Sequence, residues 1–517
     1  MPSNHPINGL PVSAIPAASG ISGPAPFYYS DRGYTTAPID PDLPNRHFAP
    51  RLSNGLTLER SLPLSPLAGS RSLLQVGSLG FVNADGGMDG YLRDYALDGR
   101  SIEVKFGRPD FAYGAFCTLF KGTARAALAE SRAGLRFELR DASWRLERPA
   151  QTSLYAGTGG LEGGSEISGL PRPIAYGACR NVTPVLVDAG LLLFQVADRP
   201  IRGITAVHDR GLALACAGDV ADILTASPPA GTYVTQLSGG YFRLGALPDG
   251  TVTADVEGDA SYGTYVAKTA DIAFRLMCDR AGFTDAGIDA TAFDRLRSDQ
   301  AAPIGLYVGT ETVSVADLLD LLFGGIGGWW GVNAEDVIDC GRIEAPADRA
   351  VAAGAVAYFS GRDVLGFSFI DLPEAVNPPW YRIRVGYARN WTVQESDLAG
   401  AVGATRRQFL VHGYRYALWS DPLVSTTHLR AQEPPAIPTL FADEADANFE
   451  AARLGALWGR RRSGLRFTTK LKGFLRRPGE TIHLDLPVAP LAGGRNVVIV
   501  GQGFDTGTNT VTLDVMW

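Results

Sequence analysis

Hydrophobic and polar residues alternate with a period of two along most of the chain. The stretch at 135–140, LRFELR, is the clearest example, and similar alternation or short apolar runs recur over 70–150, 182–265 and 356–430. Successive side chains of a strand point to opposite faces, so this pattern predicts strands with one face in solvent. Many such strands at short spacing predict β-sandwiches or β-barrels.

Residues 268–345 follow a helical period instead. KTADIAFRLMCDRAGF places apolar residues three and four positions apart before Gly282, and SVADLLDLLFGG repeats that plan. Ser314 followed by Asp317 is the pattern of a capping box. Two short strands around an acidic turn come next, so we predict a small α+β unit here.

A longer helix is predicted at about 441–459. Its apolar residues step by three and four, which predicts one buried face that packs on a barrel: Phe441, Ala445, Phe449, Ala452 and Ala456. Acidic residues at its start and arginines at its end complement the helix dipole. Two alternating stretches, 465–472 and 482–486, flank a turn at Pro478-Gly479 and predict a hairpin.

The N-terminal 65 residues are rich in proline and aromatic residues. Proline disfavours a helix, while aromatic residues are uncommon in disordered tails. We therefore expect an extended arm that lays Phe27, Tyr28, Tyr29 and Tyr34 onto a neighbouring surface, with a disordered tail as the alternative.

These patterns together predict a mainly β, multi-domain protein with a helical α+β insertion. Five segments are expected: the arm at 1–65, a β-barrel-like domain at 66–180, a second β domain at 181–265, the α+β insertion at 266–346, and a C-terminal β-barrel-like domain at 347–517. Glycine (61 residues) and proline (33 residues) are abundant in the chain of 517, as expected where many strands are joined by turns.

The distribution of charge adds one local feature to the predicted fold. The net charge of −7 gives no basic domain that would indicate nucleic-acid binding. Basic residues cluster near the predicted long helix and hairpin, at Arg460, Arg461, Arg462, Lys470 and Lys472. They fit a subunit interface or a charged lumen as well as they fit a solvated face. No apolar run approaches the 18 or more residues of a membrane span, and the first residues lack the features of a signal peptide.

No motif for catalysis, metal binding or cofactor binding stands out. The five cysteines form no C-x-x-C pair, and H-E-x-x-H, G-x-S-x-G and the phosphate-loop pattern are absent. His208 beside Asp209 resembles part of a triad, but neighbours on a strand face opposite ways. Asp255, Glu257 and Asp259 fit a solvated strand end better than a calcium site. We expect no cofactor, no metal and no enzymatic activity.

The organisation resembles that of baseplate hub proteins of long-tailed (siphophage) phages. The resemblance is strongest where ADANFEAARLGALWGRRRSGLRF is followed by RPGETIHLDLP and then by GRNVVIVGQGFDTGTNTVTLDVMW. GFVNADGGMDGYLRDYALDGRSIEVKFG also resembles the first domain of such proteins. The similarity covers most of residues 70–517, and its motifs mark a fold and an architectural role.

The resemblance implies a homotrimer in a phage virion, assembled in the host cytoplasm. In that family, two barrel-like domains per chain form a pseudo-sixfold ring around a channel through which tape-measure protein and DNA pass. The implied partners are further copies of the chain, the distal tail protein, the tape-measure protein, and tail-tip or fibre proteins. The family shares no catalytic site, so none is expected here.

Three alternatives stay open at this point. One is a hexameric distal-tail ring protein that anchors fibres. Another is a cell-wall or polysaccharide hydrolase on a β scaffold. The last is an array of carbohydrate-binding modules.

Overall fold

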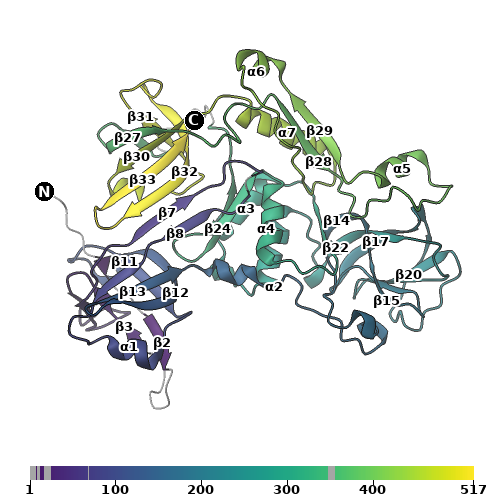
Figure 1. Cartoon of the computed structure of the whole chain (residues 1–517), viewed down its shortest axis with the longest axis horizontal. Helices are drawn as coiled ribbons and strands as arrows, with labels where there is room; N and C mark the ends of the chain where they lie inside the picture. Colours follow the sequence, from purple (N-terminus) through teal and green to yellow (C-terminus); the bar gives the residue numbers. More distant parts are fainter. Residues whose placement is uncertain (1–6, 9–11, 17–24, 68, 347–355) are drawn as a thin grey trace.

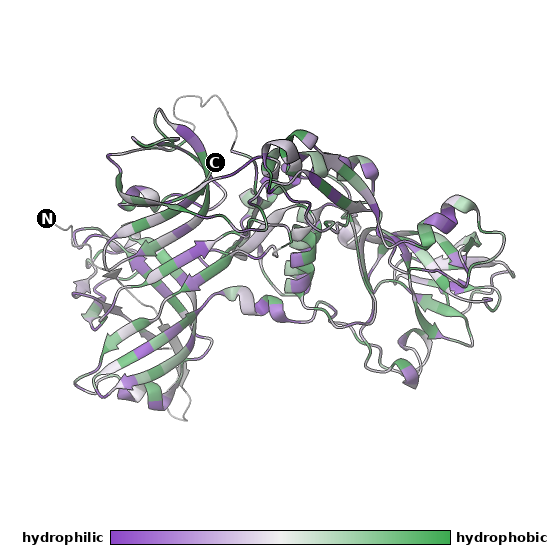
Figure 2. Cartoon of the chain, turned by 45° about the horizontal axis from the view of Figure 1, so that its top comes forward, coloured by the Kyte–Doolittle hydropathy of each residue, from purple (hydrophilic) through white to green (hydrophobic). Residues whose placement is uncertain are grey.

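The computed structural model describes residues 7–8, 12–16, 25–67, 69–346 and 356–517. Strands dominate it, in several separate sheets with few helices, which confirms the predicted mainly β, multi-domain class. Figure 1 shows an elongated molecule with β-rich units at both ends and helices α2, α3 and α4 between them. Figure 2 shows hydrophobic and hydrophilic positions mixed along the strands, as the period-two pattern requires.

The first β unit is built on an eight-stranded sheet. Its strand order is β5-β6-β4-β1-β11-β12-β13-β9, with bounds Tyr34–Thr35, His47–Pro50, Tyr29–Ser30, Ile7–Asn8, Ser101–Phe106, Cys117–Ser131, Gly134–Arg140 and Leu79–Val82. A small sheet of β10 (Tyr95–Ala96), β2 (Val12–Pro16) and β3 (Ala25–Phe27) and helix α1 (Asp89–Asp94) accompany it. Residues 25–50, expected to form the arm, therefore supply strands to this unit, while 1–6, 9–11 and 17–24 lie outside the described residues.

The C-terminal β unit contains a six-stranded path that two N-terminal strands extend. The path is β26-β31-β32-β33-β30-β27, with bounds Tyr358–Ser360, Thr481–Asp485, Arg495–Asp505, Thr510–Met516, Gly464–Thr469 and Val364–Ile370. Strand β7 (Thr57–Ser61) pairs with the second half of β32, and β8 (Leu73–Val76) pairs with β7. The expected 465–472 and 482–486 hairpin is wrong, because β30 pairs with β27 and β33 while β31 pairs with β26 and β32.

A β-sandwich lies at the other end of the molecule. One sheet is β18-β17-β22-β14-β23, with bounds Leu212–Ala213, Ile201–Asp209, Val252–Asp259, Ile174–Val182 and Gly305–Val308. The other is β15-β16-β21-β20-β19, with bounds Val185–Asp188, Leu193–Gln195, Tyr241–Leu244, Thr232–Gln236 and Ala215–Asp219. Stacked Phe194 and Phe242, with ring centroids 5.1 Å apart, lie in its core.

The central unit joins these ends. It contains α2 (Thr269–Asp279), α3 (Ala290–Asp299), α4 (Val315–Gly324) and the hairpin of β24 (Gly328–Val332) and β25 (Ile338–Arg342). Ser314 caps α4 by accepting a hydrogen bond from the backbone N–H of Asp317 at 3.1 Å, which confirms the capping residue predicted there.

A two-stranded ribbon with a long helix on it completes the fold. The ribbon is β28 (Arg382–Tyr387) and β29 (Arg415–Ser420), with short helices α5 (Ala404–Leu410) and α6 (Pro422–Thr427) near its ends. Helix α7 (Glu444–Trp458) packs against both strands of this ribbon.

The face of α7 that is buried differs from the predicted one. Ala445, Phe449, Ala452 and Ala456 point to solvent, and Phe449 is 65% exposed. The buried face instead contains Ala447, Glu450, Ala451, Leu454, Gly455, Leu457 and Trp458. Glu450 can be buried because Arg453 donates two hydrogen bonds to its carboxylate, at 2.9 and 2.6 Å.

Candidate assembly interface

Among the described residues, an edge strand closes one side of the C-terminal β unit. This strand, which we call the β27 edge, is Val364–Ile370, and it pairs with β30 on one side only. Its sequence, VLGFSFI, contains neither a charged residue nor proline. Three large side chains are substantially exposed on it: Leu365 (57%), Phe367 (42%) and Phe369 (55%).

Two of these exposed residues belong to the apolar face of the sheet. Phe367 lies opposite Phe467 and Phe369 opposite Leu465, and both partners on β30 are fully buried. The ring of Phe369 lies 6.4 Å from that of Trp517. The apolar face therefore extends beyond the core of its own unit. Natural proteins usually protect such edges with charges, proline or a covering segment, because an open edge accepts another strand.

Arg462 acts within the chain. It is 9% exposed and donates hydrogen bonds from Nε to the carbonyl of Leu457 at 2.7 Å and from Nη2 to that of Ala456 at 3.0 Å. These carbonyls lie in the last turn of α7, where they lack helical partners. Burial, and then the nearby charge of Arg460, lower the pKa of Arg462 to about 10. Arg462 therefore terminates the helix.

The other basic residues divide into two kinds. Lys472 pairs with Asp363 at 3.0 Å, and the ammonium of Lys470 lies 3.4 Å from the carbonyl of Thr508. Arg460 and Arg461 are exposed, and neither forms an ion pair with any residue that the structure describes. Of the five basic residues singled out from the sequence, Lys472 forms an ion pair, Arg462 and Lys470 contact backbone carbonyls, and Arg460 and Arg461 do neither with the described residues.

The aromatic residues of the expected arm contact the first β unit of their own chain. Phe27 packs on Tyr95 at 5.5 Å, Tyr28 on Phe48 at 5.1 Å and Tyr29 on Phe81 at 5.4 Å. The Tyr34 hydroxyl donates a hydrogen bond of 3.0 Å to the carbonyl of Phe111. Contact of these rings with a neighbouring chain stays a prediction.

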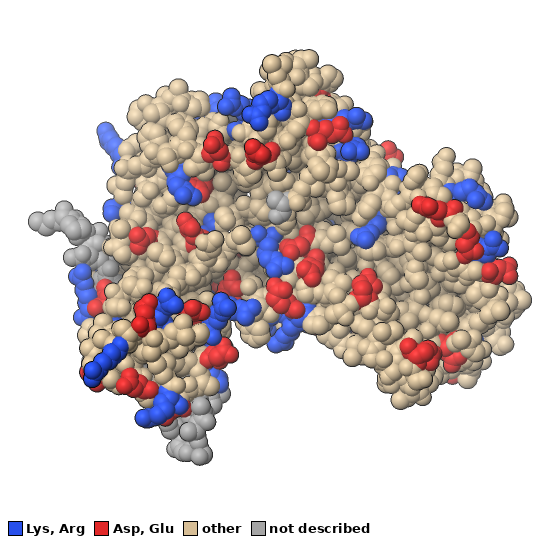
Figure 3. All heavy atoms as spheres, viewed as in Figure 1, with Lys and Arg blue, Asp and Glu red and all other residues tan. Residues whose placement is uncertain are grey.

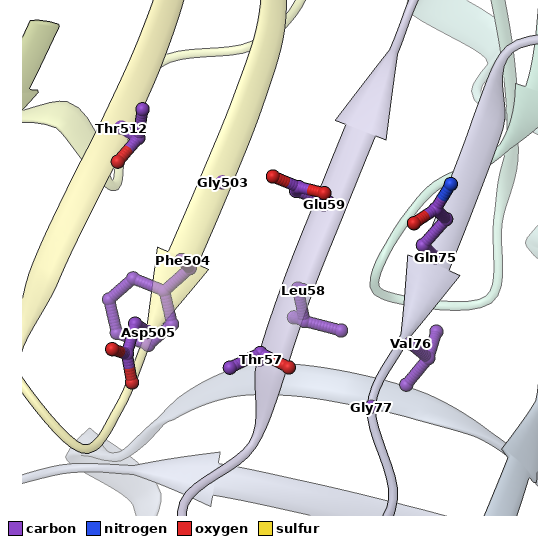
Figure 4. A pocket seen from close by; sticks show the side chains of 10 residues that line it. All are labelled: Thr57, Leu58, Glu59, Gln75, Val76, Gly77, Gly503, Phe504, Asp505 and Thr512. Atoms are coloured by element: carbon purple, nitrogen blue, oxygen red, sulfur yellow. The ribbon is translucent and has the colours of Figure 1, made fainter.

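A polar hollow of about 300 Å³ lies on the outer face of the sheet formed by β8, β7, β32 and β33 (Figure 4). The strand register places Gln75, Glu59, Gly503 and Thr512 in one row across these four strands. Figure 4 shows Glu59 between Gly503 and Gln75. We call this surface, together with Thr57 and Asp505 in the next row, the Gly503 trough.

The carboxylates around the trough differ in their partners. Arg466 donates two hydrogen bonds of 2.7 Å to Asp514, in the adjoining hollow. Asp505 accepts hydrogen bonds from the N–H of Gly507 at 2.8 Å and from the hydroxyl of Thr508 at 2.9 Å. Glu59 is exposed and forms no hydrogen bond or ion pair with the described residues.

A larger hollow of about 620 Å³ lies where the first β unit, the C-terminal β unit and the β24–β25 hairpin meet. Its arginines are already paired, Arg60 with Asp339, Arg476 with Glu480 at 3.1 Å and Arg477 with Asp289 at 3.2 Å. These pairs connect or brace the surrounding segments. We therefore assign this hollow to the junction between units.

His208 and Asp209, which were considered from the sequence as part of a catalytic triad, have different partners in the structure. Buried His208 contacts Arg406, 3.3 Å from its Nδ1, whereas Asp209 accepts hydrogen bonds from the N–H groups of Asp249 and Gly250. Burial, and then the charge of Arg406, lower the pKa of His208. Among the described residues there is no group of three or more His, Cys, Asp or Glu side chains that could hold a metal ion.

On the face shown in Figure 3, positive and negative side chains are mixed. Figure 3 shows Lys and Arg interspersed with Asp and Glu over the visible face. Such a face offers no continuous basic stripe for a nucleic-acid backbone. In the described part of the chain, no helix is both long enough and apolar enough to cross a bilayer.

Sequence reasoning singled out the basic residues but missed the β27 edge and Glu59. The uncharged run VLGFSFI predicts a strand but not an open edge, because natural edge strands usually carry charges and the position of a strand in a sheet depends on distant partners. Nothing in the sequence indicated that Glu59 lies in a hollow, because its neighbour Gly503 belongs to a strand that is far away in the sequence.

No protein-family model matches the chain, and no curated protein matches it. Solved structures do resemble it. The tail protein from Neisseria meningitidis MC58 is 10% identical, with 98% of this chain and 96% of that chain covered and a TM-score of 0.39. The 43 kDa tail protein of prophage MuSo2 from Shewanella oneidensis is 10% identical, with coverage of 89% and 93% and a TM-score of 0.35.

A chain in the virion of a native gene transfer agent particle is 15% identical. It covers 68% of this chain and 84% of its own length, with a TM-score of 0.40. These three similar structures are thus a tail protein, a prophage tail protein and a component of a virion particle.

Proposed function

We propose that this chain is a structural virion protein, the baseplate hub of a non-contractile phage tail. The observation that supports this most directly is the β27 edge, with Leu365, Phe367 and Phe369 exposed and no charge along it. Permanent subunit interfaces are more apolar than transient ones. An exposed apolar edge of this composition is expected in a chain whose edge strand is buried against another subunit.

The way the units are joined supports a rigid building block. Arg60 pairs with Asp339, and Arg280 with Asp198 at 2.6 and 2.8 Å, and all four side chains are almost fully buried. Each pair links segments of different units. A ring that must match its neighbours in size benefits from units that do not move against each other.

In the proposed ring, three copies each contribute two β units, the first and the C-terminal, to a pseudo-sixfold arrangement. That arrangement is implied by the sequence resemblance over residues 70–517. The ring would contact the distal tail protein on one side and tail-tip or fibre proteins on the other. Tape-measure protein and DNA would pass through its channel without a lasting bond.

Electron microscopy of the purified chain and of particles that contain it tests the proposal. We expect threefold rings in vitro and the chain at the distal end of the tail. A sixfold ring would favour the distal-tail alternative. A chain that is absent from particles and stays monomeric at high concentration would refute the structural role. Cleavage of peptidoglycan or glycan, lost on replacing one acidic residue, would establish the hydrolase alternative.

A further inference from the structure

Arg460 and Arg461 lie just after α7, at one end of strand β30. Both guanidinium groups are exposed, and the described residues offer them no carboxylate partner. Arg462, the third of the run, has a structural role in capping α7. The basic pair Arg460–Arg461 is therefore not needed to terminate the helix.

The Gly503 trough has the opposite character. Glu59 is exposed at its centre and forms no ion pair with the described residues, and Asp505 lies in the next row. Of the two arginines that line the adjoining hollow, Arg466 is paired with Asp514 and Arg60 with Asp339. Gly503 provides a floor with no side chain between Glu59 and Thr512. Glycine within a strand is often found where another group approaches the backbone closely.

The basic pair cannot reach the trough of its own chain. Thr468 lies in the same row as Gly503 and Thr512, and Gly464 is four residues away along β30, or about 13 Å. Ser463 continues the strand direction, because it exchanges two hydrogen bonds of 3.2 Å with Trp517. Arg460 and Arg461 precede Ser463 at this end of β30, and Glu59 lies three strands across the sheet, so the separation exceeds the length of an arginine side chain.

We infer that the basic pair Arg460–Arg461 of one copy binds the Gly503 trough of the next copy. A guanidinium group presents two parallel N–H donors that match a carboxylate such as Glu59. The hydroxyl of Thr512 and the amide of Gln75 flank that carboxylate in the same row and offer further hydrogen bonds. Charge complementarity between two surfaces of the same chain identifies the occupant as a second copy.

This contact joins two different surfaces and is therefore head-to-tail. Head-to-tail contacts close into rings when the rotation between copies permits. The inference rests on the proposed function, in which copies of the chain form a ring, and it specifies which surfaces meet. It uses a surface separate from the β27 edge.

Charge reversal tests the contact with the full-length chain. The variants are Glu59→Lys, the double replacement Arg460→Glu with Arg461→Glu, and all three changes together. Sedimentation velocity over a range of concentrations measures self-association, and thermal unfolding verifies that each variant is folded. Glu166→Lys and Arg132→Glu, at exposed positions elsewhere, serve as matched controls.

We expect each reversal alone to weaken self-association at least tenfold and the controls to leave it unchanged. The triple variant, in which the two reversed surfaces are again complementary, should recover much of the association. Wild-type association in either reversal alone, or no recovery in the triple variant, would overturn the inference while leaving the ring proposal intact. A wild-type chain that never self-associates would instead refute the proposed function.

Discussion

Arg60 and Asp339, 279 positions apart in the sequence, form a two-pronged ion pair in the interior of the protein. One of its hydrogen bonds, from Nη1 to Oδ2, is 2.8 Å long, and both side chains are less than a tenth exposed. Ser72 accepts two further hydrogen bonds from the guanidinium, and the Trp329 ring lies 5.2 Å from it. This pair connects strand β7, which extends the C-terminal sheet, to strand β25 of the central unit.

Removing one partner of this pair should destabilise the junction strongly. Asp339→Ala leaves a buried guanidinium without its counter-charge, a change that typically costs about 3–5 kcal/mol. We expect a clear drop in the denaturant midpoint, measured by tryptophan fluorescence, since the Trp329 ring lies 5.2 Å from the Arg60 guanidinium. Arg108→Ala, which breaks an exposed pair with Asp110, is the control and should cost less than about 1 kcal/mol. Equal effects of the two changes would contradict the assignment.

Asp336 should make stability depend on pH. It lies in the turn of the β24–β25 hairpin and accepts a 2.7 Å hydrogen bond from the N–H of Ala142. Burial, with a contribution from nearby Asp141, raises the pKa of Asp336 to about 6. A folded pKa above the ordinary 3.8 means that this group favours the fold fully below pH 4, and that the contribution is lost as the pH rises through 6.

Asp336→Asn removes that dependence. Asparagine tolerates the positive φ of 63° at this position and can still accept the hydrogen bond from Ala142. The variant should unfold at a higher temperature than the wild type at pH 8, and the difference should vanish near pH 4. Differential scanning calorimetry between pH 4 and 8 measures it. A variant that is less stable than the wild type at pH 8 would disprove the prediction.

Replacing Gly455 by alanine should destabilise the protein, which is the opposite of the usual effect of this replacement in a helix. Replacing glycine by alanine in a helix interior ordinarily stabilises by about 0.5–1 kcal/mol. In α7, however, a Cβ at position 455 would overlap the ring of Trp419 on β29. Overpacking typically costs about 1–3 kcal/mol, so Gly455→Ala should be destabilising on balance. Gly90→Ala in α1, where the nearest contact of a new Cβ is 3.6 Å, should be neutral or stabilising in the same urea titration.

A charge on the β27 edge should block assembly without unfolding the chain. Phe367→Lys places an ammonium on an edge strand, a device by which natural proteins prevent strand pairing. We expect loss of self-association and of incorporation into particles, with a thermal unfolding temperature within a few degrees of the wild type. Leu247→Lys replaces an 80%-exposed apolar residue on the β-sandwich and should change neither property. Normal rings formed by the Phe367→Lys protein would remove the main support for the proposed role of this edge.

The sequence alone determined the local features of this protein. Alternation identified strands such as β13 and β31, because side-chain direction in a strand depends only on its own period. The cap of α4 at Ser314 was equally local, since the hydroxyl reaches an N–H only three residues ahead. The basic residues after α7 and the absence of catalytic motifs could be read in the same way.

Only the tertiary structure decided which strands and faces meet. Leu56 and Thr506 are hydrogen-bonded across 450 positions, and nothing in the local sequence around either residue specifies that partner. The period of α7 predicted a buried face with Phe449, whereas the buried face has the pair of Glu450 with Arg453, and Gly455 lies against Trp419. The hydrophobic period of a segment shows which of its residues share a face. The free energy of burying that face depends on the surface that covers it, and this surface is formed by residues distant in the sequence.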